Sequence, residues 1–321
     1  MKVARTVAPG ETVLEDWPDP EPGFGEVVCR VLACATCGSD VQDWYVARKL
    51  PAVLGHEPAG EVVALGEGVD SVRVGDRVAI HHHAPCGVCR LCLSGHETLC
   101  AQFRSTRLDP GGFAERVLIG AELVGELLPL EDMDPVLATF TEPLGCALRG
   151  QDRAGLTAGD AVLVVGAGCS GLLNVASART RGVRSLFVSE PDEARRERAV
   201  RWGASVHAGE PVDVAIVCTP APAAIQAAFD ALDAGGRLLV YAPPAPGTPL
   251  PIDGGELFLR ELTVTSSWSA GPADMRASLA LLRSGAVDPM ELLELRVPLS
   301  ETGRALAAQQ SGAALKAVVL P

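Results

Sequence analysis

The chain has 321 residues, of which 48% are apolar and 21% charged, a composition typical of a folded protein large enough for two domains. Acidic residues outnumber basic ones, 40 to 27, and a formal charge of -13 argues against binding to nucleic acid or anionic membrane surfaces. No apolar run approaches the roughly 18 residues of a membrane span, and residues 1–17 lack the apolar core of a signal peptide. We therefore expect a cytoplasmic protein with a small-molecule partner.

Up to about residue 120, short β-rich segments alternate with glycine and proline, as at 26–35, 60–68 and 76–84. The third segment ends in three consecutive histidines at 81–83. Because neighbouring side chains on a strand point to opposite faces, these three cannot all bind one ion. We interpret them as part of a strand with one or two buried histidines.

Two residue patterns in this half of the chain suggest an open metal site. CGSD (37–40) and GHE (55–57) supply a cysteine, a histidine and carboxylates, the ligand types of an open zinc site, and Glu142 in TEPLGCAL offers a further carboxylate. Each of these residues taken singly also has a structural interpretation, as a buried thiol, a turn histidine or a helix cap.

Four cysteines fall within one short loop, in the pattern Cys86-x2-Cys89-x2-Cys92-x7-Cys100. A closed set of four thiolates is the usual ligand set of a structural zinc. An iron–sulfur cluster uses the same set, but the surrounding sequence offers no redox-chain context for one. We therefore predict a structural zinc lobe at about 84–102.

From about residue 144, apolar strands alternate with helical patterns, which indicates a parallel sheet built from βαβ units. A helix at 272–285 and apolar segments at 295–300 and 315–321 follow without a linker, and this tail could return to the first half of the chain. The expected alternating elements are strands at 161–166, 185–190, 212–220, 237–242 and 262–268, and helices at 172–182, 192–203 and 221–236.

A glycine motif, GAGCSG (166–171), lies between the first of these strands and the first helix. This context is what a dinucleotide-binding G-x-G-x-x-G requires, although a glycine-rich turn without a ligand is the alternative. The first glycine would make the tight turn, the second would admit the pyrophosphate and the third would let the helix pack closely. The residues expected to contact the cofactor are Gly166, Gly168, Cys169, Ser170 and Gly171.

Glu190 ends the second strand, at about the 20-residue spacing expected of an acid that binds the adenosine ribose. Its carboxylate would repel a 2′-phosphate, so we expect NAD to be preferred over NADP. Arg195 and Arg196 follow closely and could bind such a phosphate, but they lie in a charged run typical of a solvated helix face.

These motifs, together with PGGFAE (110–115) and the terminal LKAVVL, occur in the order seen in zinc-dependent medium-chain dehydrogenases/reductases. The chain resembles the polyol and threonine dehydrogenase branch of that family over essentially its whole length. The resemblance implies an α/β protein with two domains: a GroES-like, β-rich catalytic domain at 1–143 and 268–321, and a Rossmann domain, a doubly wound parallel sheet, at 144–267. It also implies a homodimer or homotetramer, with 262–268 as a plausible edge strand between subunits.

The resemblance makes Cys37 and His56 ligands of a catalytic zinc. Glu57 or Glu142 would bind the ion directly or through water, and we expect the two to exchange as water and substrate come and go. Glu142 stands where alcohol dehydrogenases place a second cysteine, whereas the nearby Cys146 is expected to pack inside.

By the same resemblance, Asp40 would orient His56, and Ser39 would receive the proton of the alcohol. Relatives often carry a histidine three residues after that serine, where this chain has Gln42. Glutamine cannot titrate, so the proton relay would end in water or in the cofactor ribose.

The implied activity is hydride transfer between the carbinol carbon of a secondary alcohol and NAD(P), with zinc polarising the substrate oxygen. A polyol, cyclitol, aminocyclitol or amino alcohol is the expected substrate class, and two zinc ions are expected per chain. A zinc-free reductase of the same superfamily would lack the metal ligands, and a non-catalytic protein would bind NAD without turnover. The remaining cysteines are expected to be reduced: Cys29, Cys34, Cys146, Cys169 and Cys218.

Overall fold

The computed structural model describes all 321 residues, which form two compact units. The terminal unit combines Met1–Glu142 with Gly271–Pro321, and the central unit is Pro143–Ala270. None of the helices combines the length and the apolar character that a membrane span requires.

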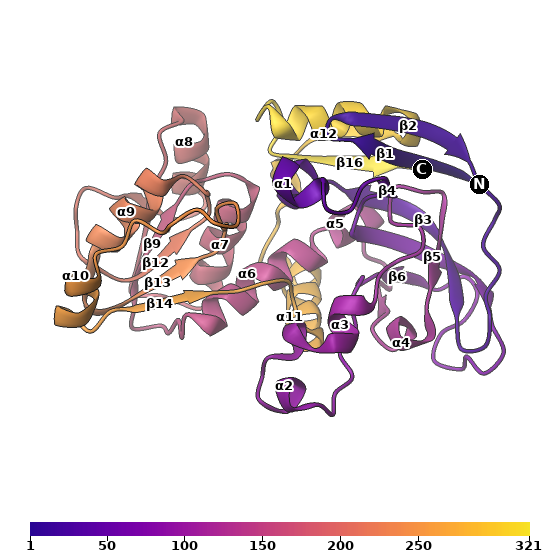
Figure 1. The fold of residues 1–321 in the computed structure, drawn as a ribbon, viewed down its shortest axis with the longest axis horizontal. Helices are drawn as coiled ribbons and strands as arrows, with labels where there is room; N and C mark the ends of the chain where they lie inside the picture. The colour runs from indigo at the N-terminus through magenta and orange to yellow at the C-terminus, as the bar shows by residue number, and fades with distance from the viewer. The chain divides into compact units, whose positions relative to one another are not determined.

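The terminal unit is built on a seven-stranded sheet and a three-stranded sheet (Figure 1). In the larger sheet the last strand of the chain, β16 (Lys316–Leu320), pairs antiparallel with β3 (Val27–Ala35), so the C-terminal segment joins a sheet begun by the first half of the chain. The order of the larger sheet is β15 (Leu293–Pro298), β16, β3, β5 (Glu57–Leu65), β6 (Arg77–Ala79) and β8 (Leu128–Pro129), with β7 (Arg116–Ile119) also on β3, and that of the smaller sheet is β2 (Glu11–Asp16), β1 (Lys2–Ala8) and β4 (Ala52–Val53).

Valine-rich strands explain the core of this unit, because β-branched side chains suit a pleated, buried surface. Seven of the nine residues of β3 are buried, and the exposed Arg30 pairs with Glu61 on the neighbouring strand. Among the helices that the sequence did not predict, α12 (Thr302–Gln310) contacts β2 and β16, and α5 (Pro135–Ala138) contacts β3 and β5.

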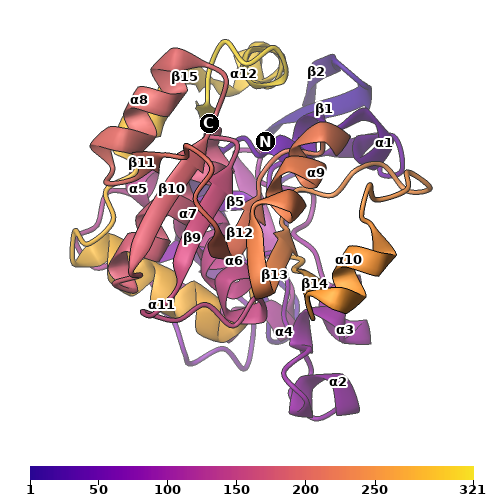
Figure 2. The same cartoon turned by 90° about the vertical axis from the view of Figure 1, so that its left-hand side faces the viewer.

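The central unit holds a six-stranded, wholly parallel sheet, whose strands lie side by side in Figure 2. All five residues of its strand β9 (Ala161–Val165) are buried, the pattern of a parallel strand covered on both faces. The fold is therefore the predicted one, a β-rich domain plus a doubly wound parallel sheet. Strand order is β11 (Ser205–Val206), β10 (Ser185–Ser189), β9 (Ala161–Val165), β12 (Val212–Val217), β13 (Leu232–Val240) and β14 (Thr263–Ser266), and the helices are α7 (Cys169–Thr180), α8 (Glu193–Arg201), α9 (Pro222–Asp230) and α10 (Gly254–Leu259).

Two predicted elements end earlier than expected. The helix predicted at 221–236 ends at Asp230, because Leu232 already pairs with Val212 and Gly235 takes a φ of 76° that a helix excludes. The strand predicted at 76–84 ends at Ala79, so the three histidines at 81–83 lie in the loop that follows it rather than in a strand.

Candidate functional site

Cys37, His56 and Glu57 come together in the terminal unit, with their ligand atoms all within 4.8 Å of one another. Cys37 lies just beyond the end of β3, and Glu57 is the first residue of β5. Because Glu57 pairs with Ala35 of β3, the register of these two strands brings the CGSD and GHE motifs to the same end of the sheet.

Asp40 contacts the Nδ1 side of the His56 ring and so orients it. Its Oδ1 lies 3.4 Å from His56 Nδ1, and its Oδ2 accepts a hydrogen bond of 3.0 Å from the Cys37 backbone N–H. Burial raises the pKa of Asp40, but the nearby His56 ring and the Cys37 amide outweigh that effect and leave the pKa below its usual value. A charged carboxylate at Nδ1 leaves Nε2 of His56 available to a metal, the usual arrangement of a ligating histidine.

The sequence did not reveal the partner of Glu57, which is Lys316 on β16. Both side chains are buried, and Lys316 Nζ forms an ion pair with Glu57 Oε2 and donates to the Thr36 carbonyl oxygen at 3.0 Å. The other carboxylate oxygen, Oε1, is buried without a hydrogen-bond partner. Burial, partly offset by Lys316, raises the pKa of Glu57 to about 7. The sequence signal for this ion pair was the lysine inside the apolar run LKAVVL, since a fully buried lysine normally needs a charged partner.

The two remaining residues predicted for this site lie beside it. Glu142, in the first turn of α6 (Thr141–Arg153), is 6% exposed and outside the three-residue group, yet its charge raises the pKa of Glu57. Ser39 is half-buried on the short 3-10 helix Gly38–Val41, between Cys37 and Asp40. A thiolate, an imidazole and a carboxylate are suitable zinc donors, and the unpartnered Oε1 of Glu57 supports that assignment.

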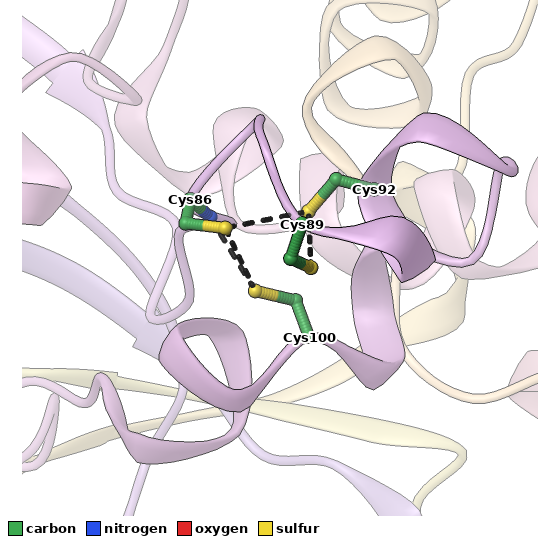
Figure 3. A group of neighbouring side chains, drawn as sticks. All are labelled: Cys86, Cys89, Cys92 and Cys100. Atoms are coloured by element: carbon green, nitrogen blue, oxygen red, sulfur yellow. Dashed lines mark hydrogen bonds between the residues drawn. The ribbon is translucent and has the colours of Figure 1, made fainter.

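The four-cysteine loop folds so that its sulfurs face one another (Figure 3). Sulfur–sulfur distances are 3.5 Å for Cys89–Cys92, 3.5 Å for Cys86–Cys100 and 3.9 Å for Cys86–Cys92. Tetrahedral zinc with bonds of about 2.3 Å requires sulfurs about 3.8 Å apart, so the group fits this ion closely. The Cys86 backbone N–H also points to the Cys100 sulfur at 3.5 Å, a contact that favours a thiolate there.

The glycine motif joins β9 to α7 in the central unit. Gly166 has a φ of 93°, which favours glycine, and a Cβ at Gly171 would collide with the Gly166 carbonyl oxygen. Gly168 caps α7, and a Cβ there would meet no atom within 4 Å. Open space above a helix N-terminus is what a bound pyrophosphate requires. Cys169 and Ser170 form the first turn of α7, so they lie at the same end of that helix.

Glu190 lies directly at this motif. Its Oε2 accepts a hydrogen bond of 2.6 Å from the Ala167 backbone N–H, and its Oε1 accepts one of 2.9 Å from the Asp192 N–H. Arg195 lies on α8, where its backbone N–H donates to the Asp192 cap at 2.9 Å. Arg196 Nη1 donates to the Glu190 carbonyl oxygen at 2.9 Å, so this guanidinium already has a backbone partner.

Family models, relatives of known name and solved structures all match this chain to dehydrogenases. Family models for the alcohol dehydrogenase GroES-like domain and for zinc-binding dehydrogenases match residues 23–130 and 170–284. The chain is 36% identical to an L-threonine 3-dehydrogenase of Pyrococcus horikoshii over 242 residues, covering 68% of this chain and 69% of that protein. It is 29% identical to a sorbitol dehydrogenase of Bacillus subtilis over 348 residues, covering 100% and 97%. A zinc-binding dehydrogenase of Sinorhizobium meliloti 1021, solved with NADP, superimposes with a TM-score of 0.89 at 28% identity, covering 100% of this chain and 99% of that one.

Proposed function

The chain belongs to the zinc-binding alcohol dehydrogenase family and is an NAD(P)-dependent oxidoreductase of that family, and from this premise we propose that its substrate is a secondary alcohol of the polyol, cyclitol, aminocyclitol or amino-alcohol type. The observation that carries the proposal is that the chain holds two separate groups of metal-ligating side chains, one of Cys37, His56 and Glu57 and one of four cysteines. A zinc-free reductase has no use for either group.

In this proposal Cys37, His56 and Glu57 hold the catalytic zinc, and the closed four-cysteine set holds a structural zinc. The bound zinc supplies Lewis acidity at the substrate oxygen, and NAD(P) supplies the hydride acceptor. Asp40 keeps His56 in the ligating tautomer, as its 3.4 Å approach to Nδ1 supports. Ser39 takes the hydroxyl proton of the substrate.

Two features of the proposal concern the path of that proton and the second carboxylate. Gln42, which cannot titrate, precedes the helix Asp43–Val46, so the proton leaves Ser39 to water or to the cofactor ribose. Glu142 is buried, and its charge raises the pKa of Glu57. It would exchange with Glu57 as a zinc ligand when substrate and water replace one another.

The cofactor is assigned to the central unit, with contacts from Gly166, Gly168, Cys169, Ser170 and Gly171, and with Glu190 selecting NAD over NADP. The hydrogen bond from Ala167 to Glu190 supports this, because it holds the carboxylate at the phosphate-binding loop. Arg195, on α8 three residues after the Asp192 cap, is included as a further cofactor contact.

Glu190→Gln is expected to change cofactor preference without unfolding the protein. The amide keeps a similar shape but loses the charge that binds ribose hydroxyls and repels a 2′-phosphate, so kcat/KM should fall about tenfold with NAD and rise severalfold with NADP. Initial rates with the two cofactors measure the ratio. Glu193→Gln removes an exposed carboxylate at the start of α8, three residues after Glu190, and should leave the ratio unchanged. An unaltered ratio in Glu190→Gln would contradict the assignment.

We also propose that copies of the chain associate along β14, an unpaired edge of the central sheet. Phe258 and Leu259, on the adjacent α10, are 80% and 75% exposed, an unusual exposure for such large apolar side chains. Phe258→Asp is therefore expected to shift a dimer or tetramer to a smaller species in sedimentation velocity. Phe24→Asp, at a phenylalanine that is 77% exposed in the terminal unit, is the matched control and should not.

A turnover screen tests the proposed function directly. The zinc-loaded protein is offered polyols, cyclitols, aminocyclitols and simple secondary alcohols, each with NAD and with NADP, and NADH or NADPH formation is followed. We expect turnover of at least one class with NAD favoured. Binding of NAD without turnover of any alcohol or ketone would instead indicate a non-catalytic nucleotide-binding protein.

A further inference from the structure

The buried face of α7 carries polar side chains where apolar ones would be expected. All residues from Gly171 to Ala178 are buried, and Asn174 and Ser177 interrupt an otherwise apolar set. Asn174 is 0% exposed, as is the Gln151 side chain of α6 that it contacts. A buried amide costs free energy unless its donors and acceptor are paired. A polar side chain kept at such a position indicates a role that apolar packing would not fill.

Hydrogen bonds at both ends fix the carboxamide of Asn174. Its Nδ2 donates to the Ser170 carbonyl oxygen at 2.9 Å and, more weakly, to Cys218 Sγ at 3.6 Å, while its Oδ1 accepts from Gln151 Nε2 at 3.3 Å. The Gln151 nitrogen also donates to the Asn174 backbone carbonyl oxygen at 3.0 Å, which fixes the identity of that end. Exchanging the two ends of the Asn174 amide would set its oxygen against the Ser170 carbonyl, so only one orientation satisfies these partners.

Cys218 places this network against the glycine turn. It directly follows β12, and a Cβ built on Gly171 would lie 3.6 Å from the Cys218 Cβ, while one on Gly166 would lie 3.6 Å from the Cys218 backbone. Burial raises the pKa of the Cys218 thiol, and a neutral thiol is only a weak hydrogen-bond acceptor. The stronger of the two bonds donated by Asn174 is therefore the one to Ser170.

The Ser170 carbonyl belongs to the same planar peptide unit as the Gly171 N–H. Gly168 caps α7, and the Leu172 N–H donates to the Gly168 carbonyl oxygen at 2.9 Å as the helix begins. The Gly171 N–H comes before that bond, so it is one of the donors that a helix N-terminus directs at an anion. A hydrogen bond from Asn174 to the carbonyl side of this peptide holds its plane and polarises it, which strengthens the N–H as a donor.

We propose that Asn174 is a positioning residue for the cofactor, which holds the peptide between Ser170 and Gly171 so that the Gly171 N–H faces the pyrophosphate. The inference rests on the proposed function, since it takes the glycine motif as the cofactor site. Asn174 does not touch the cofactor and acts only through the peptide that it holds. Without this bond the peptide must be ordered when the cofactor binds, and that ordering lowers the affinity.

The test removes the donor of Asn174 and keeps its volume. Asn174→Leu has no group that can bond to the Ser170 carbonyl, and its side chain suits the apolar face of α7. We expect the Kd for NADH to rise about tenfold in a fluorescence titration, and the KM for NAD with it, while kcat at saturating NAD stays within about twofold. ADP-ribose should weaken as NADH does. Adenosine, which has no phosphate, should bind the variant and the wild type within about twofold of each other in ligand-observed NMR.

Three further variants separate positioning from packing. Asn174→Ser and Asn174→Ala leave nearly the same empty volume, but a helical serine can donate to the carbonyl four residues before it, here that of Ser170. The serine variant should therefore bind NADH within about threefold of the wild type, and the alanine variant should bind it as weakly as Asn174→Leu. Ser177→Ala removes a hydroxyl of the same buried face, which lies 2.5 Å from Gln151 Nε2. It should lower the melting temperature and leave the Kd for NADH within about twofold.

Gly168→Asp tests the cofactor assignment separately. A Cβ at Gly168 would meet no atom within 4 Å, so the new carboxylate would enter the open space at the start of α7 and repel the pyrophosphate. If this variant binds NADH as the wild type does, the cofactor is not held at the glycine motif and that part of the proposed function fails.

The role of Asn174 is overturned, and the cofactor assignment stands, if Gly168→Asp loses NADH while Asn174→Leu keeps the wild-type affinity. Equal NADH affinities of Asn174→Ser and Asn174→Ala would overturn it too, because these two differ in the donor alone. So would an equal loss of adenosine and NADH binding in Asn174→Leu, since that pattern indicates general damage to the central unit and not a misplaced peptide at the pyrophosphate.

Discussion

Cys37→Ala is expected to remove one of two zinc ions per chain and to lower kcat/KM by about a thousandfold or more, while the protein stays folded. Cys37 supplies the only thiolate of the group it forms with His56 and Glu57. Loss of a metal that stabilises charge on the substrate oxygen by several kcal/mol corresponds to at least three orders of magnitude in rate. Elemental analysis of the purified variant measures the zinc, and initial rates on the substrate found in the screen measure the activity.

Two other cysteines make this prediction specific. Cys146→Ala changes a cysteine outside both metal groups and should keep two zinc ions. Cys100→Ala removes one of the four closely spaced sulfurs, so it should release the other zinc and expose the loop around 84–102 to limited proteolysis. A Cys37→Ala protein that retains both zinc ions, or that turns over at the wild-type rate, would exclude Cys37 as a catalytic zinc ligand.

Lys316→Met is expected to lower the free energy of unfolding by about 3 kcal/mol in the metal-free protein. The side chains of Lys316 and Glu57 are 2% and 0% exposed, and removal of one partner leaves the other charge buried without compensation. Lys316 also satisfies the Thr36 carbonyl oxygen, at 3.0 Å, and that bond is lost as well. Chemical denaturation of wild type and variant after chelation of zinc measures the difference.

Two variants show whether the uncompensated carboxylate is the cause. The double variant Lys316→Met/Glu57→Gln carries no buried charge at this position and should recover most of the lost stability. Lys2→Met breaks a surface pair with Asp16, whose side chains are 50% and 80% exposed, and should cost less than about 1 kcal/mol. A double variant no more stable than Lys316→Met alone would show that Lys316 stabilises the fold by packing, not by balancing Glu57.

Much of the candidate site could be predicted because its parts are short motifs. The four cysteines lie within one loop, and their spacing alone brings the sulfurs together. The glycine motif is similarly local, since a positive φ at Gly166 and close packing at Gly171 concern residues of one turn. The alternation of apolar strands and helices likewise indicated the parallel sheet. The helix predicted to continue past Asp230 was wrong because pairing with a distant strand overrides the local helical preference there.

Residue types and spacing therefore determined the four-cysteine set and the glycine turn of this protein, because each depends on groups close together in the chain. Only the tertiary structure shows that Glu57 gathers with Cys37 and His56 while Glu142 lies outside their group. It also decided that Lys316, on the last strand, is the partner of Glu57, and that His82 is the imidazole beside His56. These contacts follow from the pairing of β16 with β3 and of β5 with both β3 and β6, which no local pattern specifies.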